Sequence, residues 1–206
     1  ETEINTALCI ALEKEYFDIA KLLLSIKSID ASIVSIDKYD NEQTPFSIAV
    51  LKNNIDLIKE FVSRKEINVN EKIFFTKIIP ADDEDGSFAE ETAKTILHVA
   101  IENNEMEIIK LLFQHPKLNV NILSDEEVSW SYHINKVTPL FLAVKNENIP
   151  IIQMLLAHPK INVNKKSILS SKDKQKTALQ LAVEKGSIEI VKMLLNVKNI
   201  NVNVNV

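Results

Sequence analysis

Residues 138–164 read TPLFLAVKNENIPIIQMLLAHPKINVN, and this stretch predicts the fold of the whole chain. Thr138 followed by Pro139 is typical of a helix start, because threonine caps exposed backbone N–H groups and proline lacks the N–H that would go unpaired there. Apolar residues at helical spacing follow in two segments, which are separated by the polar residues 145–148. The stretch therefore predicts two short helices, joined by a tight turn and closed by Asn-Val-Asn.

The same 27-residue pattern recurs along the chain, with its cores at residues 6–32, 44–70, 95–121, 138–164 and 177–203. Self-similarity at such a length indicates a repeat architecture. One helix pair cannot bury its apolar faces alone, so neighbouring pairs stack and build a continuous core. The sequence thus predicts a single domain over residues 1–206, with longer segments between the cores at residues 33–43, 71–94, 122–137 and 165–176.

The motif Thr-Pro-Leu-x-x-Ala, the two short helices and the closing Asn-Val-Asn resemble the ankyrin repeat, in five copies that cover the whole chain. The resemblance implies an all-α repeat solenoid, a stack of helix pairs with β-hairpin-like fingers on one face. Three features depart from the family pattern. The turn after the second helix reads His-Pro at residues 115–116 and 158–159 instead of containing glycine, the signature histidine occurs only as His98, and the fingers are longer than the family's.

Composition excludes several classes of function. The 206 residues carry a net charge of −5, which argues against a general nucleic-acid binder. No apolar run is long enough to insert into a membrane. The single cysteine, Cys9, favours a reducing compartment, so we expect a cytoplasmic protein. Because the chain begins with Glu1 and not Met, we expect it to be a fragment, outside which a targeting segment could lie.

The abundance of Ile, Asn and Lys is typical of the low-GC coding found in some protists. The chain has two glycines, so asparagine is the expected left-handed residue between the helices of each pair. This expectation covers residues 53–54, 103–104, 146 and 148.

No catalytic or metal site is predicted. Residues 82–86 suggest a calcium loop, but an EF-hand register with Gly86 at its sixth position puts Ala81 and Thr92 where ligands are needed. His115 and His158 occupy equivalent places in separate repeats, which indicates a turn role. His98 is a signature residue that the resemblance places in a hydrogen bond near Thr95. Cys9 lacks a neighbouring histidine or second cysteine and is expected to be a packed thiol. We therefore predict a protein that is not an enzyme and needs no cofactor.

The segments between the cores differ in character. Residues 128–134 alternate as Val-Ser-Trp-Ser-Tyr-His-Ile, which predicts a strand. Trp130 and Tyr132 are candidate interface anchors, since these residue types are common at binding hot spots, and Phe88 is a similar candidate. Alternatively, the apolar parts of the two long fingers pack on each other, or residues 73–79 form an exposed strand edge that mediates self-association.

The resemblance also implies which positions face a partner in the groove: the two residues that follow the apolar run of each first helix, and the residue before each repeat's threonine. Together with the finger candidates, the predicted partner-binding residues are Gln43, Leu51, Lys52, Phe88, Lys94, Glu102, Asn103, Trp130, Tyr132, Val137, Lys145, Asn146, Lys176, Glu184 and Lys185. The leading hypothesis is a scaffold that binds a partner protein, whose identity is unknown, and that is monomeric in isolation. The alternatives are a regulatory spacer within a larger enzyme or membrane protein and a self-association module.

Overall fold

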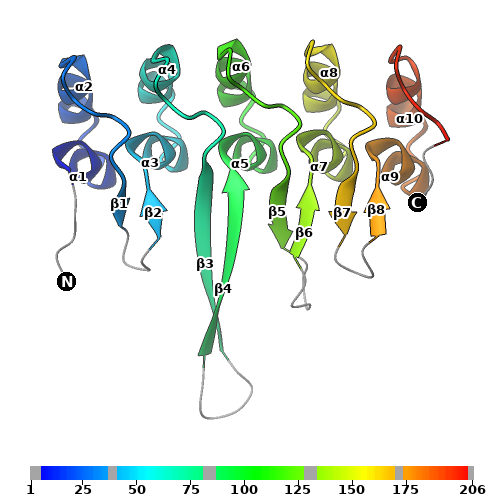
Figure 1. The fold of residues 1–206 in the computed structure, drawn as a ribbon, viewed down its shortest axis with the longest axis horizontal. Helices are drawn as coiled ribbons and strands as arrows, with labels where there is room; N and C mark the ends of the chain where they lie inside the picture. Colours follow the sequence, from blue (N-terminus) through cyan, green and yellow to red (C-terminus); the bar gives the residue numbers. More distant parts are fainter. Residues whose placement is uncertain (1–5, 37–40, 81–86, 128–133, 170–173, 204–206) are drawn as a thin grey trace. The chain divides into compact units, whose positions relative to one another are not determined.

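The structure, a computed structural model, describes the backbone of residues 6–36, 41–80, 87–127, 134–169 and 174–203. Side chains are described in these ranges except at residues 77–80, 87–90, 126–127, 134 and 174. The described helices follow one another in five pairs (Figure 1): α1 (Ala7–Glu13) and α2 (Phe17–Ser25), α3 (Pro45–Leu51) and α4 (Ile55–Ser63), α5 (Ile96–Glu102) and α6 (Met106–Gln114), α7 (Pro139–Lys145) and α8 (Ile149–Ala157), and α9 (Ala178–Glu184) and α10 (Ile188–Leu195).

An antiparallel hairpin separates each helix pair from the next, which confirms the predicted fingers. The strands are β1 (Ser35–Ile36) with β2 (Glu42–Gln43), β3 (Lys72–Pro80) with β4 (Ser87–Thr95), β5 (Ser124–Glu127) with β6 (Ile134–Val137), and β7 (Ser167–Leu169) with β8 (Lys174–Lys176). β6 also pairs with β7, so the last two hairpins form one four-stranded sheet. Most of the alternating stretch predicted as a strand, residues 128–133, lies outside the described residues.

The chain divides into two compact units. The first unit contains residues 1–96 and 110–117, and the second contains residues 97–109 and 118–206. In the first unit α1 packs on α3 and α2 packs on α4, whereas in the second α7 packs on α9 and α8 packs on α10. The single domain predicted from the repeats stays a prediction, and each unit is described by itself below.

The first helix of a pair begins at its threonine, as predicted. Thr6, Thr44, Thr138 and Thr177 are N-caps whose side-chain oxygens each accept a hydrogen bond from the backbone N–H three residues later, at 3.0–3.3 Å. Such a cap satisfies one of the donors that a helix start leaves unpaired. Pro45 and Pro139 occupy the first turn of their helices.

The turn between the two helices has a left-handed residue nine positions after each pair's threonine. The residues with positive φ are Glu15, Asn53, Asn104, Glu147 and Gly186, at 49–68°. In the fourth pair the N–H of Glu147 donates to the carbonyl of Val144, and that of Asn148 donates to Ala143. These two bonds form a Schellman motif, which needs a left-handed residue at one fixed place. The expectation for Asn146 and Asn148 is therefore wrong, because both have negative φ and the motif places Glu147 there instead.

The Asn-Val-Asn segments bridge one helix pair to the next. In the second unit the side-chain amide of Asn164 donates to the carbonyl of Asn199 at 2.7 Å, and its oxygen accepts from the N–H of Asn201 at 2.8 Å. Asn121 makes the same two bonds one pair earlier, to Lys160 and Asn162. An asparagine can both donate and accept, so one side chain pairs two backbone groups of its neighbour.

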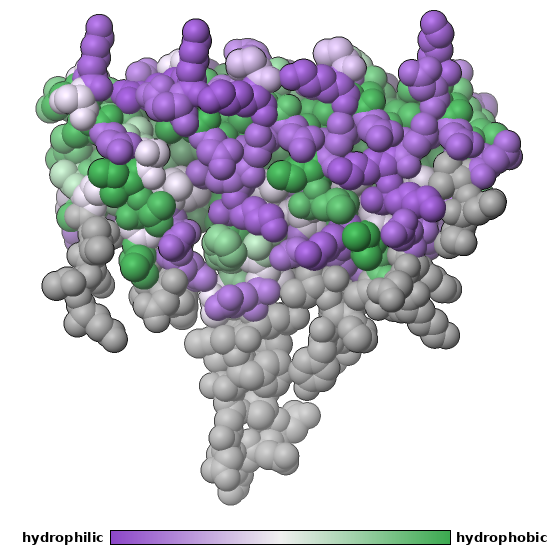
Figure 2. All heavy atoms as spheres, in the orientation of Figure 1, coloured by the Kyte–Doolittle hydropathy of each residue, from purple (hydrophilic) through white to green (hydrophobic). Residues whose placement is uncertain are grey.

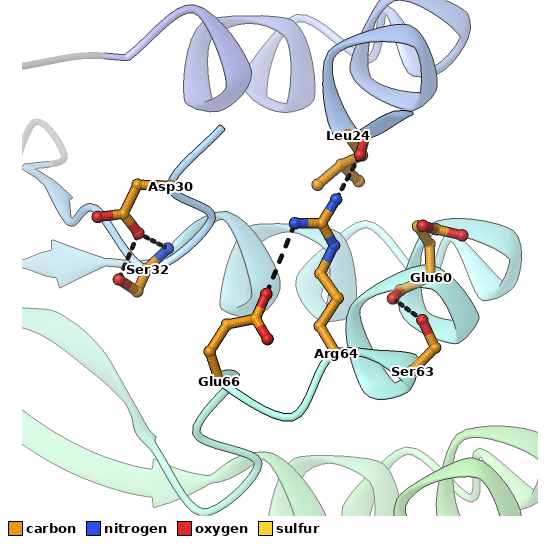
Figure 3. A network of polar contacts seen from close by, with 7 residues as sticks. All are labelled: Leu24, Asp30, Ser32, Glu60, Ser63, Arg64 and Glu66. Carbon is orange, nitrogen blue, oxygen red and sulfur yellow. Dashed lines mark hydrogen bonds and ion pairs between the residues drawn. The ribbon is translucent and has the colours of Figure 1, made fainter. Parts of the chain in front are cut away.

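The first helix pair has Ser32 where the others have this bridging asparagine, and a different contact joins it to the second pair. The guanidinium of Arg64, just after α4, donates to the carbonyl of Leu24 in α2 and lies 3.7 Å from the carboxylate of Glu66 (Figure 3). Ser32 forms a local turn instead, with its N–H and hydroxyl both donating to the carboxylate of Asp30. Arg64 thus takes over the bridging role within the first unit.

Candidate partner-binding surface

The predicted groove residues lie where the first helix of each pair ends. These helix-end positions are the last helical residue and the one after it: residues 13–14 and 51–52 in the first unit, and 102–103, 145–146 and 184–185 in the second. In α3 and α7, every residue before the helix end is buried. The helix-end residues are exposed except for Glu102, which is half-buried. Packing therefore fixes the helix body and leaves its end to solvent.

In the second helix pair, which lies in the first unit, the helix-end positions combine an apolar side chain and a charge. Leu51 is 40% exposed, at a place where the other pairs carry Glu or Lys. Lys52 forms an ion pair of 2.7 Å with Glu15, the left-handed residue of the preceding pair. In the adjoining hairpin, the ammonium of Lys94 lies 5.6 Å from the centre of the Phe75 ring, within the range of a cation–π contact.

In the second unit charges predominate. Lys185 pairs with Glu147 at 2.8 Å, which repeats the geometry of Lys52 with Glu15. Lys176, at the end of β8, pairs with Glu184 at 2.6 Å and so ties the hairpin to the helix end. Lys145 and Asn146 are exposed.

Figure 2 shows one face of the molecule, on which hydrophilic residues predominate and hydrophobic residues gather in separate patches.

The hairpin residues predicted to face a partner divide into three groups. Gln43 and Lys176 are the last residues of β2 and β8, Lys94 is the last but one of β4, and all three are half-buried. Trp130 and Tyr132 lie outside the described residues, and the side chain of Phe88 in β4 is likewise not described. Their anchor role stays a prediction.

Val137 is removed from the predicted surface, because its side chain is 0% exposed. Its carbonyl oxygen lies 3.0 Å from Nε2 of the buried His98. Since a carbonyl can only accept, Nε2 carries the proton. On β6 the preceding residue, Lys136, is exposed, so the alternation of side chains along a strand turns Val137 to the buried face.

Glu71 carries a half-buried carboxyl that the sequence does not single out. It follows Asn70 at the start of the second finger, where the other pairs carry Ile33, Ile122 and Lys165. Its carboxylate accepts a hydrogen bond of 2.5 Å from the hydroxyl of Thr44, the N-cap of α3. Burial raises the pKa of Glu71 to about 7, although hydrogen bonds from Thr44 and from the backbone of Ser47 act in the opposite direction.

The histidines and the cysteine that could bind a metal or act as a nucleophile lie in turns or in the core. Nδ1 of His115 accepts from the N–H of Lys117 at 3.3 Å, and Nδ1 of His158 accepts from Lys160 at 3.2 Å, which confirms their turn role. Cys9 is a buried thiol. Over the described ranges, no group of His, Cys, Asp and Glu side chains is arranged to hold a metal ion. The residues considered for calcium, 82–86, are outside the described part of the chain. Among the helices described, none combines the length and apolar character needed to cross a membrane.

Over the described residues, helix pairs of nearly equal length alternate with hairpins, and from the second pair on an asparagine bridges each pair to the next. This arrangement defines a repeat protein built of stacked helix pairs. The family described as ankyrin repeats in three copies matches residues 32–125, 75–167 and 119–206. The chain belongs to the ankyrin-repeat family.

Solved structures share this fold. The crystal structure of EF0377, an ankyrin repeat protein, has 16% identity and a TM-score of 0.56, and the match covers 92% of this chain and 96% of that one. An ankyrin repeat domain from Acinetobacter baumannii AYE has 18% identity and a TM-score of 0.55, with 91% of this chain and 95% of that one covered. At such identities the likeness concerns the fold alone. The comparison with curated proteins found no match. Ankyrin repeats are in general protein-interaction modules and are typically non-catalytic.

Proposed function

We propose that this chain is a non-catalytic scaffold that binds a partner protein through its helix-end positions and the adjoining hairpins. The observation that supports the proposal is the contrast along each first helix between a buried body and an exposed, variable end. The residue at the helix end changes from Glu13 to Leu51, Glu102, Lys145 and Glu184, whereas the Ala two residues earlier is the same in every pair. Packing constrains the residue at the invariant position, whereas the residue at the variable position is available to contact a partner.

Leu51 is the proposed anchor in the first unit. An exposed leucine at a position that otherwise carries charge offers a partner an apolar contact. Lys52, the next residue in the chain, is a cation held by Glu15, and Lys94 in the adjoining hairpin is a second cation, held against the Phe75 ring; we propose that both contribute to the polar rim of this contact. Such a centre of one apolar side chain with a polar rim is the usual anatomy of an interface hot spot.

The second unit offers a polar surface instead. Exposed ion pairs such as Lys185–Glu147 and Lys176–Glu184 contribute at most about 1 kcal/mol to folding stability. A charged group of the partner can therefore replace one member of such an ion pair at little cost in free energy. The pairs also hold long side chains in place, which lowers the entropy lost on binding. Trp130, Tyr132 and Phe88 remain proposed anchors in the fingers.

The location and the alternative roles stay at the level of hypotheses. We propose a cytoplasmic location, which is consistent with the buried, unpaired thiol of Cys9. The possibility that the repeats regulate a larger protein has no particular observation in its favour on the described residues.

Replacing Leu51 with alanine should weaken binding of a protein fragment selected from a displayed library against this chain. We expect the dissociation constant to rise about tenfold, the effect of losing an interface anchor of roughly 1.4 kcal/mol. A fragment that contacts the second unit should be sensitive to Lys145→Glu instead. Fluorescence polarisation with a labelled fragment measures both.

Leu22→Ala is the matched control, because Leu22 is 67% exposed on the second helix of its pair, away from the helix-end positions. It should change the dissociation constant less than twofold. Fragments that bind normally to both Leu51→Ala and Lys145→Glu, or that are lost in Leu22→Ala, would show that binding uses another surface.

A further inference from the structure

A pocket lies between the first and second repeats, within the first unit. Its volume is about 300 Å³, and its lining comes from the turns after α2 and α4, from the start of α3 and from the first two hairpins. Phe46 and Ile67, which are 0% and 3% exposed, form an apolar part of its wall. A pocket of this size has room for one long side chain. Among the described residues, its lining includes none of the helix-end positions.

The pocket lies where the repeat pattern lacks its bridging asparagine. In the second unit, such an asparagine binds a backbone carbonyl and a backbone N–H of the next helix pair. At the first junction the equivalent residue is Ser32, which bonds to Asp30 instead. The backbone groups that an asparagine would bind here belong to Glu66 and Asn68. Both residues line the pocket together with Ser32, and Figure 3 shows Ser32 and Glu66 on the turns that follow α2 and α4.

Glu71 is a second departure from the repeat pattern, and it lines the same pocket. The equivalent residues Ile33, Ile122 and Lys165 have no carboxyl group. The carboxylate of Glu71 is half-buried and accepts a hydrogen bond of 2.5 Å from the hydroxyl of Thr44, which also lines the pocket. Two departures that are distant in the sequence thus meet at one place, outside the helices. Such changes in connecting segments, beside an intact core, are typical of a binding site.

The charges of the pocket favour a cation. Glu42 on β2 and Glu66 after α4 are exposed carboxylates of its lining, and Lys72 on β3 is an exposed ammonium group there. Arg64 compensates part of the charge of Glu66, at 3.7 Å. The half-buried carboxyl of Glu71 adds a third acidic group. A cationic ligand therefore complements the described lining better than an anionic one does.

The apolar part of the lining suits a long basic side chain. Val34 and Phe74 line the pocket and are 36% and 37% exposed, so a methylene stem can pack on them while its charged head lies farther in. A guanidinium has several N–H donors in a plane and is more weakly hydrated than an ammonium. It can therefore bind a half-buried carboxylate and a backbone carbonyl at the same time.

We propose that this pocket binds the side chain of an arginine presented by a partner protein, with the guanidinium on Glu71 and the backbone carbonyl of Glu66, and the stem along Val34 and Phe74. The arginine then occupies the place that the bridging asparagine has at the later junctions. The inference goes beyond the proposed function, because it names a second contact and its chemistry. It needs none of the helix-end residues, so either role can fail without the other.

Binding should depend on pH through Glu71, because burial raises the pKa of this carboxyl to about 7. A guanidinium binds the ionised carboxylate, whose fraction rises from about 0.1 at pH 6 to about 0.9 at pH 8. The affinity for arginine should therefore rise about tenfold over this range. The other charged groups of the described lining, Glu42, Glu66 and Lys72, are all exposed. Glu71→Gln should remove the pH dependence and raise the dissociation constant at pH 8 about tenfold.

Amide NMR shifts of the labelled chain, titrated with the peptide acetyl-Ala-Arg-Ala-amide, test the proposal. Its counterpart with citrulline is the control ligand, because citrulline has nearly the shape of arginine without the charge. The arginine peptide should shift the signals of residues such as Ser32, Glu66 and Glu71 in a saturable way. The citrulline peptide should bind at least about tenfold more weakly. No saturable shift at these residues, or equal affinity for the two peptides, would overturn the proposal.

Ser32→Asn tests the place of binding, because it supplies the asparagine that bridges the later junctions. Its side chain should pair with the backbone of Glu66 and Asn68, close the pocket and raise the dissociation constant of the arginine peptide more than about tenfold. Glu60→Gln is the matched control, since Glu60 is an exposed carboxylate of α4 that is not part of the described lining. It should change the dissociation constant less than twofold. Thermal melting verifies that each variant folds.

The variants can contradict the proposal in two ways. Normal binding of the arginine peptide to both Ser32→Asn and Glu71→Gln would place its site elsewhere. A loss in Glu60→Gln as large as that in Glu71→Gln would show that the peptide responds to the overall charge of the chain and not to this pocket.

Discussion

Replacing Phe61 with alanine should lower the free energy of unfolding by about 3–5 kcal/mol. Phe61 in α4 is 0% exposed, and its ring lies 5.7 Å from the ring of Phe46 in α3, tilted by 42°. Removal of the ring loses its transfer free energy and leaves a cavity between the two helices of the second pair. Because repeats are stabilised through their neighbours, the loss should spread to the adjacent helix pair.

Urea unfolding followed by circular dichroism measures the effect, and Phe74→Ala is the matched control. Phe74 is 37% exposed in β3, so its truncation should cost less than about 1 kcal/mol. Amide hydrogen exchange should localise the loss to α3 and α4 first. An effect of Phe61→Ala no larger than that of the control would mean that the second pair is not packed as the structure has it.

Replacing Glu71 with glutamine should stabilise the chain at pH 8 by up to about 3 kcal/mol and have almost no effect near pH 4.5. Burial raises the pKa of Glu71 from 4.5 to about 7 in the folded chain, so folding favours the protonated carboxyl. That contribution to stability is fully present below pH 4.5 and is lost as the pH rises through 7. Glutamine keeps an oxygen to accept the hydroxyl of Thr44 but has no charge to bury.

The difference in unfolding free energy between the variant and the unaltered chain, measured from pH 4.5 to pH 8, isolates Glu71, since other groups titrate in both proteins. Glu42→Gln is the control, because Glu42 is an exposed carboxyl in the neighbouring hairpin. At pH 8 this exposed substitution should change the unfolding free energy by no more than about 0.5 kcal/mol. Equal pH profiles for Glu71→Gln and the unaltered chain would contradict the raised pKa.

Helix boundaries and hairpins were predictable because each depends on local residues. Thr44 and Thr138 cap helices through their own side chains, and Pro45 and Pro139 are compatible only with a first turn. The left-handed residue was predicted as asparagine from the propensity of the residue type. Glu15 and Glu147 take that conformation because the Schellman motif fixes the position, whatever residue stands there.

The parts of the site that could not be predicted depend on contacts between distant residues. No local pattern marks Glu71, because it follows its asparagine as the equivalent residues of the other pairs do. Its partial burial arises from the contact of the finger with Thr44. The pairs Lys52–Glu15 and Lys185–Glu147 join consecutive helix pairs across 37 and 38 positions. The exposure of the helix ends was implied by the family resemblance, whereas the burial of Val137 required the observed strand geometry.

In the proposed function, the helix ends and hairpins bind a partner protein. Hydrogen–deuterium exchange of the chain, with and without the selected fragment, tests it most directly. Protection should appear in peptides that cover residues 43–52 and 87–103, or 134–146 and 174–185, and not in those that cover α2, α4, α8 or α10 alone. Protection confined to these second helices, with the helix ends and hairpins unchanged, would show that the partner binds another surface.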